Sequence, residues 1–163
     1  MSAEAGSGHP QRWEGEAGAR RLLSIVRASC PQGEDLPTRL GAGLRAALGE
    51  LAADPELASL LSVEAHLHPD EGALDAQREW TRRFGAVLRD AAASEPRASA
   101  VEPSFLAPFL IDGVRFQIGR MVIAGEASDL LRILPQTLAA LLAYYFEPGE
   151  SRALARAALG GPQ

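Results

Sequence analysis

The chain has 163 residues, of which 47% are hydrophobic and 23% charged, and its formal net charge is −5. This length and composition predict one globular domain with a hydrophobic core of its own. All 16 basic residues are arginines that lie among 21 acidic residues, so the sequence offers no basic stripe for direct nucleic-acid binding.

Three features of the sequence favour a cytoplasmic location and no membrane partner. No apolar run approaches the about 20 residues that a membrane-spanning helix needs. The first residues are polar, and they lack the basic and apolar segments of a secretion signal. Cys30 is the single cysteine, so an internal disulfide is excluded and nothing indicates an oxidising compartment.

The residue pattern predicts an all-α fold, a single-domain helical bundle of about six to seven helices. Alanine, leucine, arginine and glutamate dominate the sequence, and these residues form helices readily. Apolar residues recur every three or four positions, and alternating strand-like runs are absent. The expected organisation is a disordered tail over 1–11, a helical domain over 12–147, and a short helix with a tail over 148–163.

The predicted helices follow one another with short breaks, most of them marked by proline or glycine. Pro37 and Pro55 each suit the first turn of a helix, where the missing N–H is not needed. Pro103 could open the fifth helix, but Pro108 would then lie inside it, and a start near Leu106 avoids that conflict. Pro135 either kinks the sixth helix or marks its start. The expected ranges are 12–29, 37–53, 55–65, 70–93, a fifth helix ending near 124, 128–146 and 150–159.

Residues 105–146 are apolar around most of the circumference of two successive predicted helices. Such helices must be covered on more than one side, and the rest of this chain can cover one face of each. An uncovered apolar face usually marks an interface, so we expect the last two long helices to form a four-helix bundle with those of a second copy. Alternatively, both are central core helices of a monomer. The expected dimer-interface residues are Val114, Ile118, Met121, Leu138, Leu141, Leu142 and Tyr145.

Several short motifs occur in a fixed order along the chain. Ala53-Asp54-Pro55 separates two predicted helices, Val63-Glu64-Ala65 ends the shorter of them, and Arg82-Arg83-Phe84 precedes Leu88 in the long fourth helix. A final pattern comprises Gly125-Glu126, Leu131, Leu134-Pro135, Leu138, Leu141-Leu142 and Tyr145. In order and spacing, residues 13–146 resemble the C-terminal effector-binding and dimerisation domain of TetR-type transcriptional regulators.

This resemblance implies a ligand-responsive regulatory domain that forms a homodimer. A small apolar effector would bind between the early helices, the long fourth helix and the fifth helix. Glu64 would face inward and need a partner, for which Arg82, Arg83 or Arg115 are candidates. The residues expected to line the effector site are Leu44, Leu48, Leu61, Glu64, Trp80, Phe84 and Phe116.

The sequence departs from the TetR pattern at its N-terminus. Only about a dozen polar residues precede the first predicted helix, which leaves no room for the family's DNA-reading helix-turn-helix. We therefore expect no direct DNA binding by this chain. Three alternatives stay open. The start of the gene is truncated or misassigned and a DNA-reading segment is missing, the chain forms mixed dimers with a complete regulator, or the fold has been reused as a small-molecule-binding module.

Catalysis, a metal site and a cofactor are not expected. His66 and His68 would point about 200° apart on a helix, so they would not share a metal unless the chain turned between them. Cys30 follows the end of the first predicted helix, where the negative end of the dipole raises a thiol pKa. The sequence contains no nucleophile paired with a base, so we predict that the protein is not an enzyme.

Overall fold

A computed structural model describes residues 9–64, 71–93, 95 and 103–160, and every regular element among them is helical. The prediction of an all-α bundle is therefore confirmed. The helices are α1 (His9–Ser29), α2 (Leu36–Ala53), α3 (Pro55–Ser59), the π-helical turn η1 (Leu60–Glu64), α5 (Glu71–Ala92), α6 (Pro103–Ile123), the 3₁₀ helix η2 (Ala127–Ile133), α7 (Leu134–Leu142) and α8 (Pro148–Ala158). None of the described helices combines the length and the hydropathy that a bilayer crossing requires.

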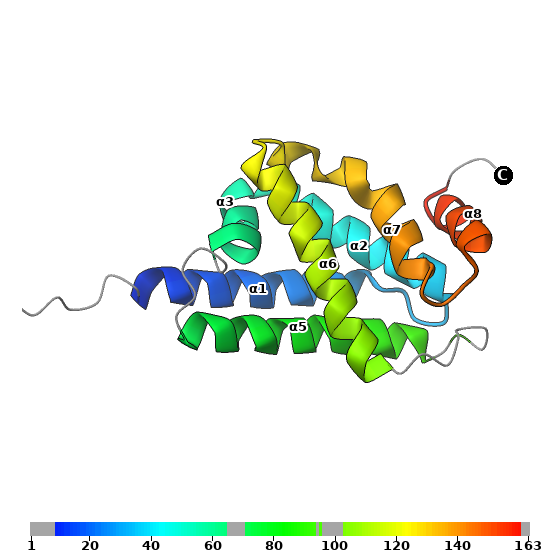
Figure 1. The fold of residues 1–163 in the computed structure, drawn as a ribbon, viewed down its shortest axis with the longest axis horizontal. Coiled ribbons are helices and arrows are strands. Elements are labelled where there is room, and N and C mark those ends of the chain that lie inside the picture. The colour runs from blue at the N-terminus through cyan, green and yellow to red at the C-terminus, as the bar shows by residue number, and fades with distance from the viewer. Residues whose placement is uncertain (1–8, 65–70, 94, 96–102, 161–163) are drawn as a thin grey trace, which may run out of the picture.

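Helix α2 lies at the centre of the molecule. It packs against α1, α3, α5, η2, α7 and α8 (Figure 1). Its first turn is capped by Asp35, whose side chain accepts a hydrogen bond from the backbone N–H of Thr38 at 2.9 Å. Its last residue is followed by Asp54, which accepts from the N–H of Leu57 at 3.0 Å and so opens α3. The cap by Asp54 explains why the predicted break after residue 53 is present.

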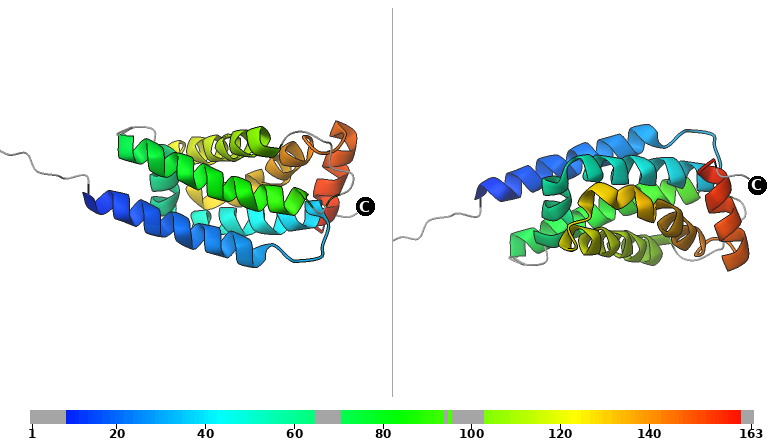
Figure 2. Two further views of the ribbon diagram at one scale, coloured as in Figure 1. Left: turned by 90° about the horizontal axis from the view of Figure 1, so that it is seen from below. Right: turned by 90° about the horizontal axis from the view of Figure 1, so that it is seen from above.

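The helices are arranged so that α1 and α6 lie on opposite sides. Figure 2 shows α1 along one side of the molecule and α6 with α7 along the other, with α2 and α5 between them. Two groups of buried side chains fill the interior. One is centred on Leu36, Leu138 and Leu142, and the other on Leu48 and Leu130, all of which are fully buried.

The segment 128–146 is not the single long helix that the sequence predicts. Residues Ala127–Ile133 form a 3₁₀ helix, and only Leu134–Leu142 are α-helical. Pro135 lies in the first turn of α7, because a proline there loses no intrahelical hydrogen bond. Of the two long helices that the sequence predicts for an interface, α6 is therefore long, and the second is replaced by η2 and the short α7.

Helix α6 begins at Pro103 and contains Pro108, although a start near Leu106 would have avoided a proline inside the helix. The loss is confined to one hydrogen bond in the second turn, close to the helix end. Leu106 and Ala107 are buried, and Ala107 lies against the glycine at position 85 of α5. This packing holds the first turns of α6 in place.

The start of α1 and the end of the third predicted helix also differ from expectation. Helix α1 begins at His9, three residues before the predicted start at residue 12. The predicted helix 55–65 is α-helical for Pro55–Ser59 and continues as the π-helical turn Leu60–Glu64. This π-helical turn packs against α6.

Arg39 links α2 to the end of α5. Its side chain is buried, and its Nη1 donates hydrogen bonds to the carbonyl oxygens of Asp90 and Ala91 at 3.4 and 3.3 Å. The last carbonyls of a helix lack intrahelical partners and carry the negative end of its dipole. Arg39 therefore stabilises the C-terminal end of α5 from within the core.

Replacing Arg39 with methionine should lower the free energy of unfolding by about 1–3 kcal/mol, because buried carbonyls lose a charged donor. The measurement is urea unfolding followed by circular dichroism. Arg27→Met removes an exposed arginine from α1, and this control should change stability by no more than about 0.5 kcal/mol. Equal unfolding midpoints for the two variants would contradict the role assigned to Arg39.

Candidate interaction surface

The outer side of α6 carries a row of large apolar side chains. Phe109, Phe116 and Ile123 recur every seven residues, and they are 59%, 66% and 75% exposed. Residues seven apart lie on the same side of a helix, two turns from one another. The row therefore forms a continuous stripe that the rest of the described chain does not cover.

Two further large apolar side chains are exposed on segments that follow α6 in the chain, and one of them, Tyr144, contacts the stripe. Leu131 lies on η2, and Tyr144 follows the end of α7. The rings of Phe109 and Tyr144 meet edge to face, with centroids 6.4 Å apart and an interplanar angle of 70°, an arrangement that favours aromatic pairs. We call the surface formed by Phe109, Phe116, Ile123, Leu131 and Tyr144 the α6 face.

The inner side of α6 fixes its rotation about its own axis. Gly119 lies so close to the π-helical turn η1 that a Cβ atom there would be 3.1 Å from the carbonyl oxygen of Ser62. Ile118, beside Gly119, is buried among the core side chains. A Cβ atom on this residue would be closer than most ordinary contacts, so Gly119 lies against η1 at the flank of the stripe. Ile118 lies roughly 140–180° around the helix from the stripe residues, so its burial in the core turns the stripe outward.

Arg115 adds a polar contact between α6 and η1. Its Nε donates to the carbonyl oxygen of Leu61 at 3.3 Å, and its Nη1 donates to Oδ1 of Asp112 at 3.3 Å. Burial lowers the pKa of the Arg115 guanidinium, and the charge of Asp112 opposes this shift. Arg115 thus satisfies a carbonyl of the π-helical turn and fixes Asp112 at the edge of the α6 face.

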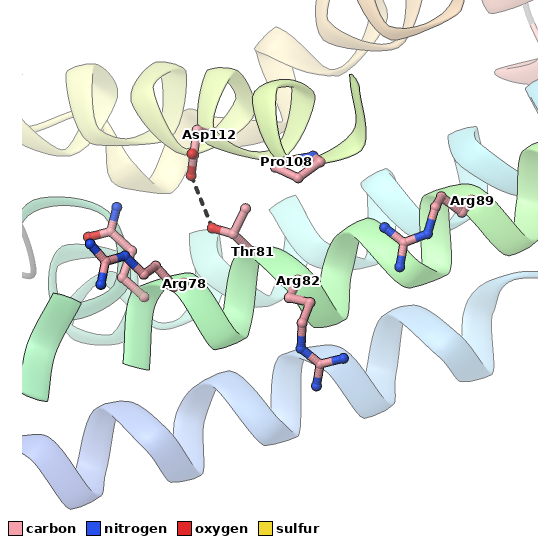
Figure 3. A pocket seen from close by; sticks show the side chains of 7 residues that line it. Arg78, Thr81, Arg82, Arg89, Pro108 and Asp112 are labelled. Carbon is pink, nitrogen blue, oxygen red and sulfur yellow. Dashed lines mark hydrogen bonds between the residues drawn. The ribbon is translucent and has the colours of Figure 1, made fainter. Parts of the chain in front are cut away.

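Polar side chains flank the stripe and carry opposite charges. Asp112 is exposed, and its Oδ1 also accepts a hydrogen bond from Oγ1 of Thr81 on α5 at 3.1 Å (Figure 3). Arg120 is exposed as well, and no described residue forms an ion pair or hydrogen bond with its side chain. One acidic and one basic group therefore border the apolar stripe.

The residues predicted for the dimer interface lie mostly inside the single chain. Leu138 and Leu142 are fully buried, and Ile118, Leu141 and Tyr145 are also buried in the core. Val114 and Met121 are half-buried and pack against the same core. Side chains enclosed by their own chain offer little surface to a partner, whereas the outer residues of α6 are exposed, and the interface at the seven predicted residues stays a prediction.

Most of the residues predicted to line an effector site lie in or against the core. Leu48 is fully buried, and Leu44, Leu61 and Phe84 pack against the same buried cluster. The guanidinium of Arg83 lies 5.0 Å from the ring centroid of Trp80. Phe116 belongs to the α6 face and points away from the core, so the structure does not bring it to the other six.

Glu64 has a different partner from those that the sequence suggested. Its Oε1 accepts a hydrogen bond from Oγ of Ser59 at 3.3 Å. Arg82 and Arg83 instead bind Glu79, with distances of 2.6–2.7 Å. Hydrogen bonds from Arg82 and then Arg83 lower the pKa of Glu79 to about 2. The predicted ion pair of Glu64 with an arginine is thus replaced by a short-range contact within the α3–η1 segment.

An open groove of about 490 Å³ lies between α5 and α6, away from the predicted effector residues (Figure 3). It is lined by Gln77, Arg78, Thr81, Arg82, Arg89, Pro108 and Asp112. Figure 3 shows Arg82 directed away from Asp112, and Glu79 already pairs with this arginine. The arginines of the groove do not converge on one point, so the groove is not built like a site for a single anion.

The remaining sequence candidates show no reactive arrangement. Cys30 is buried, and its Sγ donates to the carbonyl oxygen of Arg39 at 3.6 Å. Burial raises the pKa of the Cys30 thiol, and the charge of Arg39 partly offsets this shift. The described residues contain no group of three or more potential metal ligands. His66 and His68 lie outside the described residues.

No family model, curated protein or solved structure matches the chain. The likeness to TetR-type domains therefore stays a hypothesis based on the motifs of the sequence. The sequence analysis did not identify the α6 face because apolar residues lie on nearly every side of α6. The seven-residue spacing of Phe109, Phe116 and Ile123 is the signal that could have found it.

Gly119→Leu should lower the free energy of unfolding by about 1–3 kcal/mol, because the new side chain meets a backbone oxygen that cannot move aside. Gly113→Ala is the control on the same helix, since nothing lies within 4 Å of a Cβ atom at that position. This control should be as stable as the parent or more stable by up to about 1 kcal/mol, because alanine favours helix. Thermal or urea unfolding at low protein concentration measures both, and a Gly119→Leu variant as stable as Gly113→Ala would contradict the proposed seat of α6.

Proposed function

We propose that this protein is a dimerisation domain of a regulatory protein, and that two copies associate through the α6 face. The observation that carries the proposal is the stripe of Phe109, Phe116 and Ile123 on a helix whose rotation is fixed by its inner contacts. Large exposed apolar patches on folded proteins usually mark interaction sites. Burying one such side chain contributes about 1.5–3 kcal/mol, and two-fold symmetry doubles the number of side chains buried.

The resemblance to TetR-type regulators supports a regulatory role of this kind. In such a role the domain would pair two subunits, and an effector would change how they pack. Of the residues expected to bind an effector, Leu44, Leu48, Leu61 and Phe84 lie in or against the core and Phe116 belongs to the α6 face. Pairing is therefore the better supported half of the proposal. With a net charge of −5, the chain would regulate through protein contacts rather than by binding DNA itself.

Phe116→Arg should weaken self-association by about 30-fold or more, because Phe116 lies at the centre of the stripe and central interface residues contribute about 2 kcal/mol or more. Sedimentation equilibrium over a range of micromolar concentrations gives the mass. The parent should approach twice the 17.2 kDa of one chain, and the variant should stay near the mass of one chain.

The matched control for Phe116→Arg is Ala28→Arg, which adds the same charge at an exposed position of α1, on the opposite side of the molecule (Figure 2). This control should associate like the parent. Since Phe116 is mostly exposed, both variants should keep the helical circular dichroism of the parent. A monomeric parent, or a Phe116→Arg variant that dimerises like the parent, would overturn the proposed function.

Electrophoretic mobility-shift assays with duplex DNA provide a separate test of the regulatory mode. We expect no salt-sensitive, sequence-specific complex with the isolated chain, because its net charge is −5 and an acidic chain is poorly suited to replace the counterions of the phosphates. A specific complex with nanomolar affinity would show that the chain reads DNA directly.

A further inference from the structure

We infer that the two copies pair through α6 in antiparallel orientation, with the two-fold axis passing beside Phe116. This inference rests on the proposed function, since it specifies the partner and the register of the same surface. It commits the α6 face to one occupant, a second copy of this chain, in one arrangement.

The apolar stripe of α6 and the two charged residues that flank it are placed symmetrically about Phe116. Phe109 and Ile123 lie seven residues before and after it, and Asp112 and Arg120 lie four residues before and after it. In an antiparallel pair with its axis at Phe116, each position meets the position equally far on the other side. Phe109 then packs against Ile123 of the partner subunit, and Asp112 lies at the level of Arg120 of the partner subunit. Each contact occurs twice because the interface is two-fold symmetric.

The charges on α6 distinguish this arrangement from a parallel one. In a parallel pair in register, Asp112 would lie beside Asp112 of the partner subunit, and Arg120 beside Arg120 of the partner subunit. Like charges in close contact across an interface are costly, whereas opposite charges fix its register. The antiparallel pair replaces two repulsive contacts with two attractive ones and keeps the apolar residues aligned.

Both charged groups are available for a contact between subunits. The Asp112 side chain is 53% exposed, although it contacts Thr81 and Arg115. A carboxylate can accept about four hydrogen bonds, so these two contacts orient Asp112 and leave capacity for a partner. Arg120 is exposed and makes no ion pair with a described residue. A second copy supplies the complementary charge to each of them, which a partner without this symmetry would not do.

The test uses charge reversal in the full chain, with the dissociation constant of the dimer measured by sedimentation. Arg120→Asp should weaken the dimer roughly ten-fold, because the new carboxylate then faces Asp112 of the partner subunit at both contacts. Adding Asp112→Asn in the same chain should restore most of the lost affinity, since the amide removes the repulsion and can still accept from Thr81. The exchange Asp112→Arg with Arg120→Asp in one chain should also restore dimerisation, since the opposite charges meet again with their positions reversed.

Control variants and outcomes separate the register from the proposed function. Arg27→Asp makes the same charge reversal on exposed α1 and should leave the dimer unchanged. If the parent is a dimer that weakens with Phe116→Arg but is indifferent to Arg120→Asp, the antiparallel register is wrong while the proposed function stands. If Arg120→Asp weakens the dimer and Asp112→Asn does not rescue it, Arg120 does not face Asp112 and the register is again wrong. If the parent is a monomer, both the register and the proposed function fail.

Discussion

The close approach of α6 to the π-helical turn η1 determines which surface the protein presents. Gly119 allows the backbone of α6 to come near the carbonyl of Ser62, and Arg115 satisfies the neighbouring carbonyl of Leu61. A helix held by such contacts cannot rotate to bring its outer residues inward. Phe109, Phe116 and Ile123 are therefore kept in solvent by the same packing that completes the core.

The core of a single chain is already complete without a partner. Leu138, Leu142 and Tyr145 are enclosed by side chains of the same chain, and Arg39 stabilises the end of α5 from inside. Folding and association are therefore separable, unlike in obligate dimers whose monomers do not fold alone. We expect that a surface of this kind can be altered at Phe116 without loss of the fold, and that subunits of the proposed dimer would exchange.

Much of the fold follows from the sequence because helix ends carry local signals. Asp35 and Asp54 cap helices, and Pro37 and Pro55 occupy first turns. Gly125, with a φ of 76°, lies in the turn that follows the end of α6. The division of 127–142 into a 3₁₀ helix and a short α-helix was harder to predict, since Pro135 is compatible with either a kink within one helix or the start of a new one.

The candidate surface was harder to predict than the helices. Nearly every side of α6 is apolar, so periodicity does not distinguish inward residues such as Ile118 from outward ones such as Phe116. The distinction comes from Gly119, whose contact with η1 joins segments almost 60 residues apart in the chain. The partner of Glu64 was missed for the opposite reason. Ser59 lies only five residues away and donates to Glu64, while the candidate arginines Arg82 and Arg83 bind Glu79.

Distances between spin labels on the two copies test most directly whether α6 faces α6 in solution. A label at Gln117→Cys, on the exposed side of α6, is compared with a label at Ala28→Cys on α1, both in a Cys30→Ser chain. Pulsed dipolar spectroscopy should give a short, narrow distance for Gln117→Cys and a much longer one for Ala28→Cys. A dimer in which the label at position 28 gives the shorter distance, or a chain with no dipolar signal at position 117, would contradict the association of two copies through the α6 face.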